Sequence, residues 1–129
     1  MANILVAEDD RAVQSFVVRA LAHKGHSVTA ADDGLQALDA LHEAEFDLLV
    51  TDIVMPGLDG IGLALKVARD WPDLPILLMT GYSAERQRAY NLEELICRVV
   101  MKPFTLEQIC REAASVLATG RSPVSVGGY

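Results

Sequence analysis

Short apolar runs alternate with helical patterns along the whole of this chain, and this alternation restricts the possible folds more than any other feature. The apolar runs occupy residues 3–7, 27–31, 47–51, 75–79 and 98–101, and the helical patterns occupy residues 11–24, 34–43, 60–71, 84–95 and 105–118. A strand that is followed by a helix again and again predicts a parallel sheet, because each connection must cross back over one face of the sheet. We therefore expect an α/β domain with a parallel sheet covered by helices on both faces.

The apolar runs differ in pattern, and this predicts where each strand lies. The runs ILVA, LLV, ILLM and VVM are apolar without alternation, which is typical of central strands buried on both faces. Residues 27–30 alternate instead, like an edge strand. At the helix ends, Asp10 is a candidate N-cap, Thr105 and Gln108 form a capping-box pattern, and Gly25 is placed to end the first helix.

Length and composition predict one globular domain. A chain of 129 residues with 51% apolar content can bury one core, which we assign to residues 1–118, while the Gly-, Ser- and Pro-containing stretch 119–129 predicts a disordered tail. No run approaches the roughly 20 apolar residues of a membrane helix, and the chain enters its first strand without a basic leader. We expect a cytoplasmic protein without a membrane partner.

Charge and cysteine content exclude further classes. The net charge of −7 argues against a nucleic-acid partner, because such proteins need a basic face. Cys97 and Cys110 show no CxxC spacing, and we expect buried, reduced thiols instead of a disulfide or a metal site. Proteins are the expected partners.

Charged residues stand where three of the apolar runs end. Glu8-Asp9-Asp10 follows the first run, Asp52 follows the third, and Lys102 follows the fifth. These ends meet at the ligand-binding crevice of an open parallel sheet. Carboxylates gathered there stay ionised together only beside a cation, which predicts a hard divalent ion, Mg²⁺ or Mn²⁺, with oxygen ligands. Lys102 can then pair with an arriving anion, above all a phosphoryl group.

Each acidic residue receives a role from its position. Asp52 is the candidate nucleophile, because a carboxylate at a strand end can attack a phosphorus atom whose oxygens a metal has polarised. Asp9 is expected to bind the metal directly, the backbone carbonyl of Val54 is a further ligand, and Glu8 acts through water. We interpret Asp10 as a helix cap and not as a ligand.

Residues near the last two strand ends complete the expected site. Thr80 and Lys102 can donate hydrogen bonds to phosphoryl oxygens, and Gly81 leaves room for a phosphate near the backbone. The bond before Pro103 is a candidate cis peptide that would aim Lys102 into the crevice. Taken singly, each residue could be an ordinary cap or a solvated charge, but such a reading leaves three charged strand ends unexplained.

Four motifs in order link the chain to a known family. They are Glu8-Asp9, Asp52 in LLVTDIVMPGLDG, Thr80-Gly81 in ILLMTG, and Lys102-Pro103-Phe104 in VVMKPF. Together they resemble the receiver domain of bacterial response regulators over residues 3–118. The resemblance implies a flavodoxin-like, doubly wound, five-stranded sheet in the order 2-1-3-4-5. It also implies that Asp52 is phosphorylated by a histidine kinase or a histidine phosphotransfer protein, with Mg²⁺ required.

The chain departs from the family pattern in two places. Val99 stands three residues before Lys102, where receivers often carry an aromatic switch, so a swinging ring cannot relay the signal here. Residues 83–96 lack the usual Gly-Ala turn and are weakly amphipathic, and we expect a short, displaced or mobile fourth helix. The expected output face combines residues 83–96, the fifth strand and the helix at 105–118.

Two function classes remain in play. The first is a phosphorylation switch that binds another protein. The second is a metal-dependent phosphohydrolase of the haloacid-dehalogenase type, which needs a second carboxylate two residues after its nucleophile. That residue is Val54 here, so an aspartyl phosphate should persist, with weak autodephosphorylation only, and we expect a signalling domain and not an enzyme.

The output partner has three candidates. The stretches VAEDD, LLVTDIVMPGLDGIGLA, TGYSAE and KPFTLEQI most resemble the CpdR-type receivers, a family that acts as an adaptor for the ClpXP protease. That resemblance implies a ClpX-type unfoldase as partner. Chemotaxis-type motor binding and phosphorelay shuttling are the alternatives.

Overall fold

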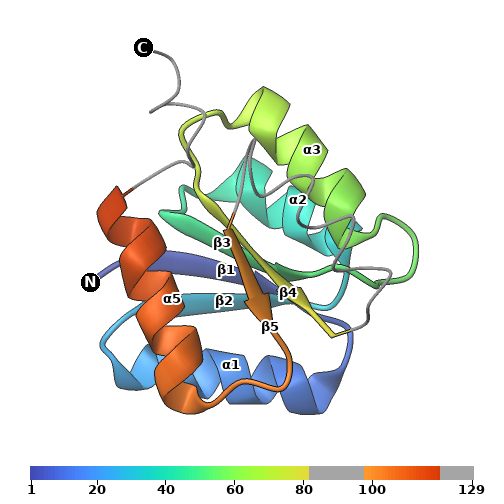
Figure 1. Ribbon diagram of the computed structural model, residues 1–129. Coiled ribbons are helices and arrows are strands. Elements are labelled where there is room, and N and C mark those ends of the chain that lie inside the picture. Colours follow the sequence, from blue (N-terminus) through green and yellow to red (C-terminus); the bar gives the residue numbers. More distant parts are fainter. Residues whose placement is uncertain (82–97, 120–129) are drawn as a thin grey trace.

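The computed structural model describes residues 1–81 and 98–119, and Figure 1 shows a central sheet between two layers of helices. The elements are β1 (Asn3–Ala7), α1 (Arg11–His23), β2 (Ser27–Ala31), α2 (Gly34–Glu43), β3 (Leu48–Asp52), α3 (Gly60–Asp70), β4 (Ile76–Thr80), β5 (Arg98–Met101) and α5 (Leu106–Thr119). The alternation of strands and helices that the sequence predicted is confirmed for these ranges. The expected fourth helix lies outside the described residues.

The sheet is parallel and has the order β2-β1-β3-β4-β5, which confirms the predicted topology. Its register brings the ends of neighbouring strands to within one residue of each other, since Ala7 pairs with Thr51 and Asp52 pairs with Met79. Thr80 pairs in turn with Met101 of β5. The residues that follow β1, β3 and β5 therefore meet at one end of the sheet.

Two apolar layers cover the sheet. On one face α2 and α3 pack against side chains such as Leu5 and Leu49, and on the other face α1 and α5 pack against Ile4, Leu48 and Val50 (Figure 1). Successive residues of a strand point to opposite faces, so a central strand needs apolar residues at every position. This explains the unbroken apolar runs of β1, β3 and β4.

The sequence predicted the position of one of the two edge strands but not of the other. β2 lies at one edge, as predicted, and most of its side chains are exposed or half-buried. The run VVM belongs to β5, which lies at the other edge of the sheet formed by the described strands, so interpreting this run as a central strand was wrong. Val100 is buried there, but Val99 is half-buried and Met101 is exposed, because β5 pairs with β4 alone among these strands.

Local caps fix the helix ends. Asp10 accepts hydrogen bonds from the amides of Ala12 and Val13, and Gly25 follows α1 with a φ of 94° that favours glycine. The Thr105 and Gln108 side chains each accept a bond from the other residue's amide, which is the predicted capping box.

The boundaries of the domain need one correction. Thr119, which we assigned to the tail, is the last residue of α5, and its hydroxyl donates to the Ser115 carbonyl at 3.0 Å. Residues 120–129 lie outside the described residues. None of the helices in the two described ranges has the length and hydropathy that a membrane span requires.

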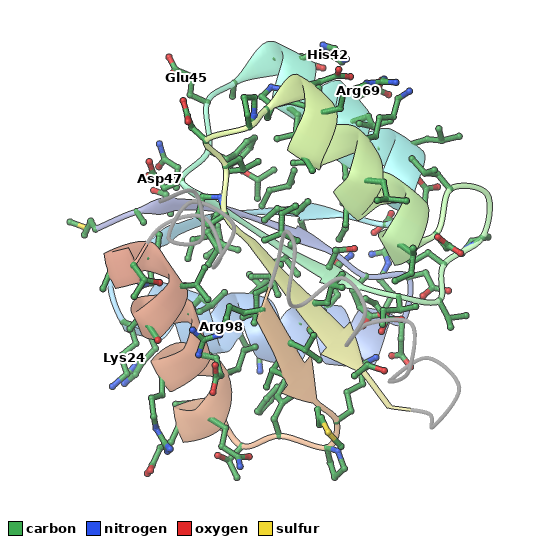
Figure 2. All side chains as sticks on the ribbon, turned by 45° about the horizontal axis from the view of Figure 1, so that its top comes forward. Lys24, His42, Glu45, Asp47, Arg69 and Arg98 are labelled. Carbon is green, nitrogen blue, oxygen red and sulfur yellow. The ribbon has the colours of Figure 1, made fainter. Side chains whose placement is uncertain are left out.

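The described surface carries scattered positive charges. Figure 2 shows Lys24 and Arg69 projecting from opposite ends of the structure. Arg69 pairs with Asp70 at 2.9 Å, and Arg98 approaches Glu112 at 3.7 Å.

The thiol of Cys110 is free and buried, as predicted, and it donates to the Ala20 carbonyl, while Cys97 lies outside the described residues.

Candidate functional site

Three carboxylates converge at the carboxyl ends of β1 and β3. One oxygen from each of Glu8, Asp9 and Asp52 lies within 4.8 Å of the others. Glu8 is only 1% exposed and Asp52 only 6%, whereas Asp9 faces solvent. Two buried carboxylates and one exposed carboxylate so close together form a donor set that suits a hard cation entering from the Asp9 side.

Lys102 reaches the carboxylates from the end of β5. Its Nζ lies 2.8 Å from Asp52 Oδ1 and 3.2 Å from Glu8 Oε1. Its backbone amide donates to the Thr80 carbonyl at 2.7 Å, which joins the loop after β5 to the end of β4. The peptide bond between Lys102 and Pro103 is cis. An anion that bound beside Asp52 would therefore compete with the Asp52 carboxylate for the Lys102 ammonium group.

Burial and charge shift the ionisation of the site. Burial is the main cause that raises the pKa of Glu8 to about 7; the charge of Asp52 adds to it, and the Asp10 amide and Lys102 oppose it. Burial lowers the pKa of Lys102, but the hydrogen bonds and charges of Asp52 and Glu8 outweigh burial and raise it above its usual value. Without a metal, the site holds more acidic than basic groups, and its carboxylates repel one another.

Thr80 has a buried hydroxyl without a hydrogen-bond partner among the described residues. The residue is 0% exposed, and it ends β4 next to the loop that carries Lys102. A buried polar group without a partner costs free energy, so this hydroxyl can donate to an oxygen that enters the crevice. The next residue, Gly81, lines the same crevice, where an added Cβ would meet Lys102 at 3.7 Å, an ordinary contact.

Backbone packing fixes the position of Asp52. Thr51 Oγ1 donates to the Asp52 carbonyl at 2.9 Å, and the Gly60 amide donates to Ile53 at 2.7 Å. A Cβ on Gly60 would collide with the Asp52 carbonyl oxygen, so only glycine allows α3 to begin this close to the loop. The glycine of the LDG motif is therefore needed by the packing of the loop that follows the candidate nucleophile.

A cavity of about 570 Å³ opens beside Asp52. Its walls combine α1, the loop after Asp52 and the loop before α5, through Ala12, Val13, Phe16, Asp52, Val54, Gly81, Lys102, Pro103 and Phe104. Among these lining residues, the ring centroids of Phe16 and Phe104 lie 6.2 Å apart. Val54 is 53% exposed at the position where a phosphohydrolase would need an acid. The charged site is thus bordered by a largely apolar surface.

One buried residue near the site was missed by sequence reasoning. Gln14 of α1 is 7% exposed, and its Nε2 donates to oxygens of Glu8, Ala31 and Asp32. The only signal in the sequence is a polar residue beside the apolar stripe of the first helix. Val99, three residues before Lys102, is partly buried and packs against the core on the α2 and α3 side of the sheet.

Comparison with known proteins agrees with this geometry. A family model described as the response regulator receiver domain matches residues 4–114. The response regulator receiver protein CpdR of Brucella abortus (strain 2308) is 40% identical over 117 residues, which cover 91% of this chain and 98% of CpdR.

Two further proteins show how widely the same unit is used. The response regulator MprA of Mycobacterium avium (strain 104) is 37% identical over 115 residues, which cover 89% of this chain and 50% of MprA. This chain therefore spans half the length of MprA. The solved structure of the chemotaxis response regulator CheY4 of Vibrio cholerae superposes with a TM-score of 0.82 at 25% identity, covering 90% of this chain and 98% of CheY4.

Proposed function

Since this chain belongs to the response regulator receiver family, we propose that Asp52 accepts a phosphoryl group and that Glu8, Asp9 and Asp52 hold the Mg²⁺, or Mn²⁺, that the transfer requires. The observation that carries the proposal is the convergence of these three carboxylates with Lys102 at one end of the sheet. Receiver domains are signalling domains that histidine kinases or phosphotransfer proteins phosphorylate, and those proteins are the proposed donors here.

The chemistry follows from the positions of the side chains. A carboxylate oxygen of Asp52 attacks the phosphorus of a phosphohistidine, the phosphorus–nitrogen bond breaks, and a mixed anhydride forms on Asp52 while the electron pair leaves with the imidazole. A bound divalent ion would neutralise the carboxylates and polarise the phosphoryl oxygens. Asp9 is exposed and can bind the ion directly, the Val54 carbonyl is the proposed backbone ligand, and the buried Glu8 acts through water.

Phosphorylation changes the partners of two side chains. Lys102 now pairs with Asp52 at 2.8 Å, and the phosphoryl oxygens offer it a stronger anion. The hydroxyl of Thr80 has no partner among the described residues and would gain one from the same group. The amide of Lys102 already bonds the Thr80 carbonyl, so the two residues would move together.

The proposed readout uses the part of the fold attached to these residues. Lys102 connects β5 to α5, and a change in its position is transmitted along both elements. Residues 83–96, which complete the proposed output face, lie outside the described residues. Because Val99 offers no ring to swing, we assign the relay to the backbone around Thr80 and Lys102.

Similarity to CpdR favours one kind of output. We propose a phosphorylation-dependent adaptor that binds a protein of the ClpX type, with motor binding or phosphoryl shuttling as the alternative outputs of the same switch. Val54 supplies no acid or base, so the proposal excludes rapid hydrolysis, and weak autodephosphorylation remains. The net charge of −7 supports a protein partner over a nucleic acid.

The proposal is tested by labelling with a small phosphodonor. Wild-type protein should gain one phosphoryl group in intact-mass spectra when Mg²⁺ is present, and EDTA should prevent the gain. Asp52→Asn should remain unlabelled. Asp47→Asn is the matched control at the opposite end of the sheet, where Asp47 caps the amide of Asn3, and it should label like wild type. Equal labelling of Asp52→Asn and wild type contradicts the proposal.

A further inference from the structure

Gln14 is a buried amide that ties three segments together. Its Nε2 lies 2.9 Å from the Glu8 carbonyl oxygen, 3.2 Å from the Ala31 carbonyl oxygen and 2.9 Å from Asp32 Oδ1, so its two N–H groups are shared among three acceptors. These acceptors belong to the loop after β1, the end of β2 and the loop after β2. One side chain of α1 therefore holds the ends of two strands at the edge of the candidate metal site.

The segment that Gln14 holds carries two of the three carboxylates. The Glu8 amide donates to the Ala31 carbonyl at 3.1 Å, and the Asp10 amide donates to Glu8 Oε2 at 3.1 Å. The carbonyl of Glu8 is bonded to Gln14, and the next peptide unit leads to Asp9. Only three residues separate β1 from α1, so a shift of the Glu8 carbonyl moves both Glu8 and Asp9.

Packing alone does not require a polar residue at this position. Gln14 lies on α1 beside Val13 and three residues before Val17, which is 0% exposed in the core. A leucine would continue this apolar stripe, and burying an amide is unfavourable unless its hydrogen bonds are made. The amide lies where its donors meet the Glu8 carbonyl of the proposed metal-binding segment, together with the Ala31 carbonyl and Asp32 Oδ1.

We propose that Gln14 is a positioning residue for the divalent cation, acting through the Glu8 carbonyl to hold Glu8 and Asp9 at the distance from Asp52 that the ion requires. The inference rests on the proposed function. Removing a group that hydrogen-bonds to a metal-binding residue commonly weakens metal affinity by about 10- to 100-fold. Loss of the Gln14 donor should therefore weaken binding of the ion while Asp52 itself stays unchanged.

The test compares donor loss with ordinary destabilisation. Gln14→Leu removes the donor and keeps the volume, Gln14→Met does the same with an unbranched chain of similar length, and Val17→Ala removes core packing three residues away. Mg²⁺ affinity is measured by NMR titration of backbone amides at a temperature where each variant is folded. We expect about tenfold weaker Mg²⁺ binding for whichever Gln14 variants fold, and binding within twofold of wild type for Val17→Ala.

Phosphorylation kinetics supply a readout that a purely structural role would not move. With a small phosphodonor, the rate for Gln14→Leu should be low at limiting Mg²⁺ and return to the wild-type rate at saturating Mg²⁺. Arg11→Ala is a second control, because it removes only the exposed ion pair with Asp32 and leaves the Gln14 bonds in place. Its Mg²⁺ dependence should match that of wild type.

A metal-free measurement separates this inference from the proposed function. The amide of Asp10, bonded to Glu8 Oε2, should exchange its hydrogen faster in Gln14→Leu than in wild type and in Val17→Ala. If wild type binds no Mg²⁺, the proposed function fails, and Asp10 exchange alone decides whether Gln14 positions the segment. Unchanged exchange, Mg²⁺ binding within twofold of wild type for the Gln14 variants, or an equal loss of affinity in Val17→Ala overturns the inference.

Discussion

Both ends of the sheet carry acidic residues, but the surroundings of these residues differ between the two ends. At the carboxyl ends of the strands, Glu8 and Asp52 are buried beside each other with one lysine between them. At the amino ends, Asp47 is exposed and accepts the Asn3 amide at 2.8 Å, and Asp70 is exposed and pairs with its neighbour Arg69. Carboxylates at the amino ends complete local structure, whereas those at the carboxyl ends repel one another.

This difference separates residues that stabilise the fold from residues that the proposed function requires. Removing a capping or paired acid should cost a little stability and no activity. Removing an acid from the crevice should cost activity and can leave the metal-free fold more stable, because sites built for a ligand carry unfavourable interactions in its absence. The comparison can be tested at four places.

The largest effect is expected from loss of Asp9, the exposed carboxylate of the proposed metal site. Asp9→Ala should abolish Mg²⁺ binding and Mg²⁺-dependent labelling of Asp52, because Asp9 is the exposed carboxylate of the three and the proposed direct ligand. Asp47→Ala should leave both unchanged. Isothermal titration with Mg²⁺ and intact-mass labelling measure the two outcomes. Equal labelling of Asp9→Ala and wild type at limiting Mg²⁺ would remove Asp9 from the metal site.

The second effect is a pH dependence of the metal-free protein. The pKa of Glu8 is about 7 in the folded state, above its ordinary value of 4.5, so the folded state binds this proton more tightly than the unfolded chain. Ionising Glu8 therefore destabilises the fold: stability falls as pH rises from 4.5 through 7, by up to roughly 3 kcal/mol. The free energy of unfolding is measured with urea, in the presence of EDTA, at pH 5 and at pH 8. The difference between these two values should be much smaller in Glu8→Gln than in wild type.

The opposite end of the sheet gives the opposite sign. Arg69 lowers the pKa of Asp70, mainly by a hydrogen bond, so ionised Asp70 favours the folded state and this contribution is lost only as pH falls below about the ordinary value of 3.8. Asp70→Asn should therefore show the wild-type difference between pH 5 and pH 8. A Glu8→Gln protein that keeps the full wild-type difference would show that Glu8 is not the destabilising group.

The third effect concerns the lifetime of the phosphoryl group. Val54 is exposed beside Asp52 and cannot orient a water molecule, whereas an amide there can. Val54→Asn should speed autodephosphorylation about tenfold, which is roughly 1.4 kcal/mol in the barrier. Leu65→Asn is the control, because Leu65 is 52% exposed on α3 and outside the crevice lining. An unchanged half-life in Val54→Asn would place the control of water elsewhere.

Much of the fold and the convergence of the site could be predicted because their signals are local. Apolar runs and helix stripes are read within one element, and the charges at the site directly follow the runs that end there. The edge position of β5 was not visible in its own residues, because the number of strands beside it decides burial. Gln14 was missed for a similar reason: two of its acceptors, Ala31 and Asp32, come from another strand end and become neighbours only after folding.

The smallest effect is the sharpest test of the comparison, because it concerns two buried threonines next to the site. Thr51 Oγ1 donates to the Asp52 carbonyl at 2.9 Å, whereas Thr80 Oγ1 has no partner among the described residues. Valine has the same shape without the hydroxyl. Thr51→Val should therefore lower the free energy of unfolding by about 1 kcal/mol, and Thr80→Val should raise it by a similar amount.

Urea denaturation of the unphosphorylated, metal-free proteins measures both changes, and labelling of Asp52 provides the functional half of the test. Thr80→Val should still be phosphorylated but bind an output partner as though it were unmodified, because the hydroxyl would act after transfer. If both substitutions lowered stability equally, the Thr80 hydroxyl would already be satisfied in the resting protein. Thr80 would then stabilise the fold, as Asp47 does, and the contrast between the two ends of the sheet would not include the end of β4.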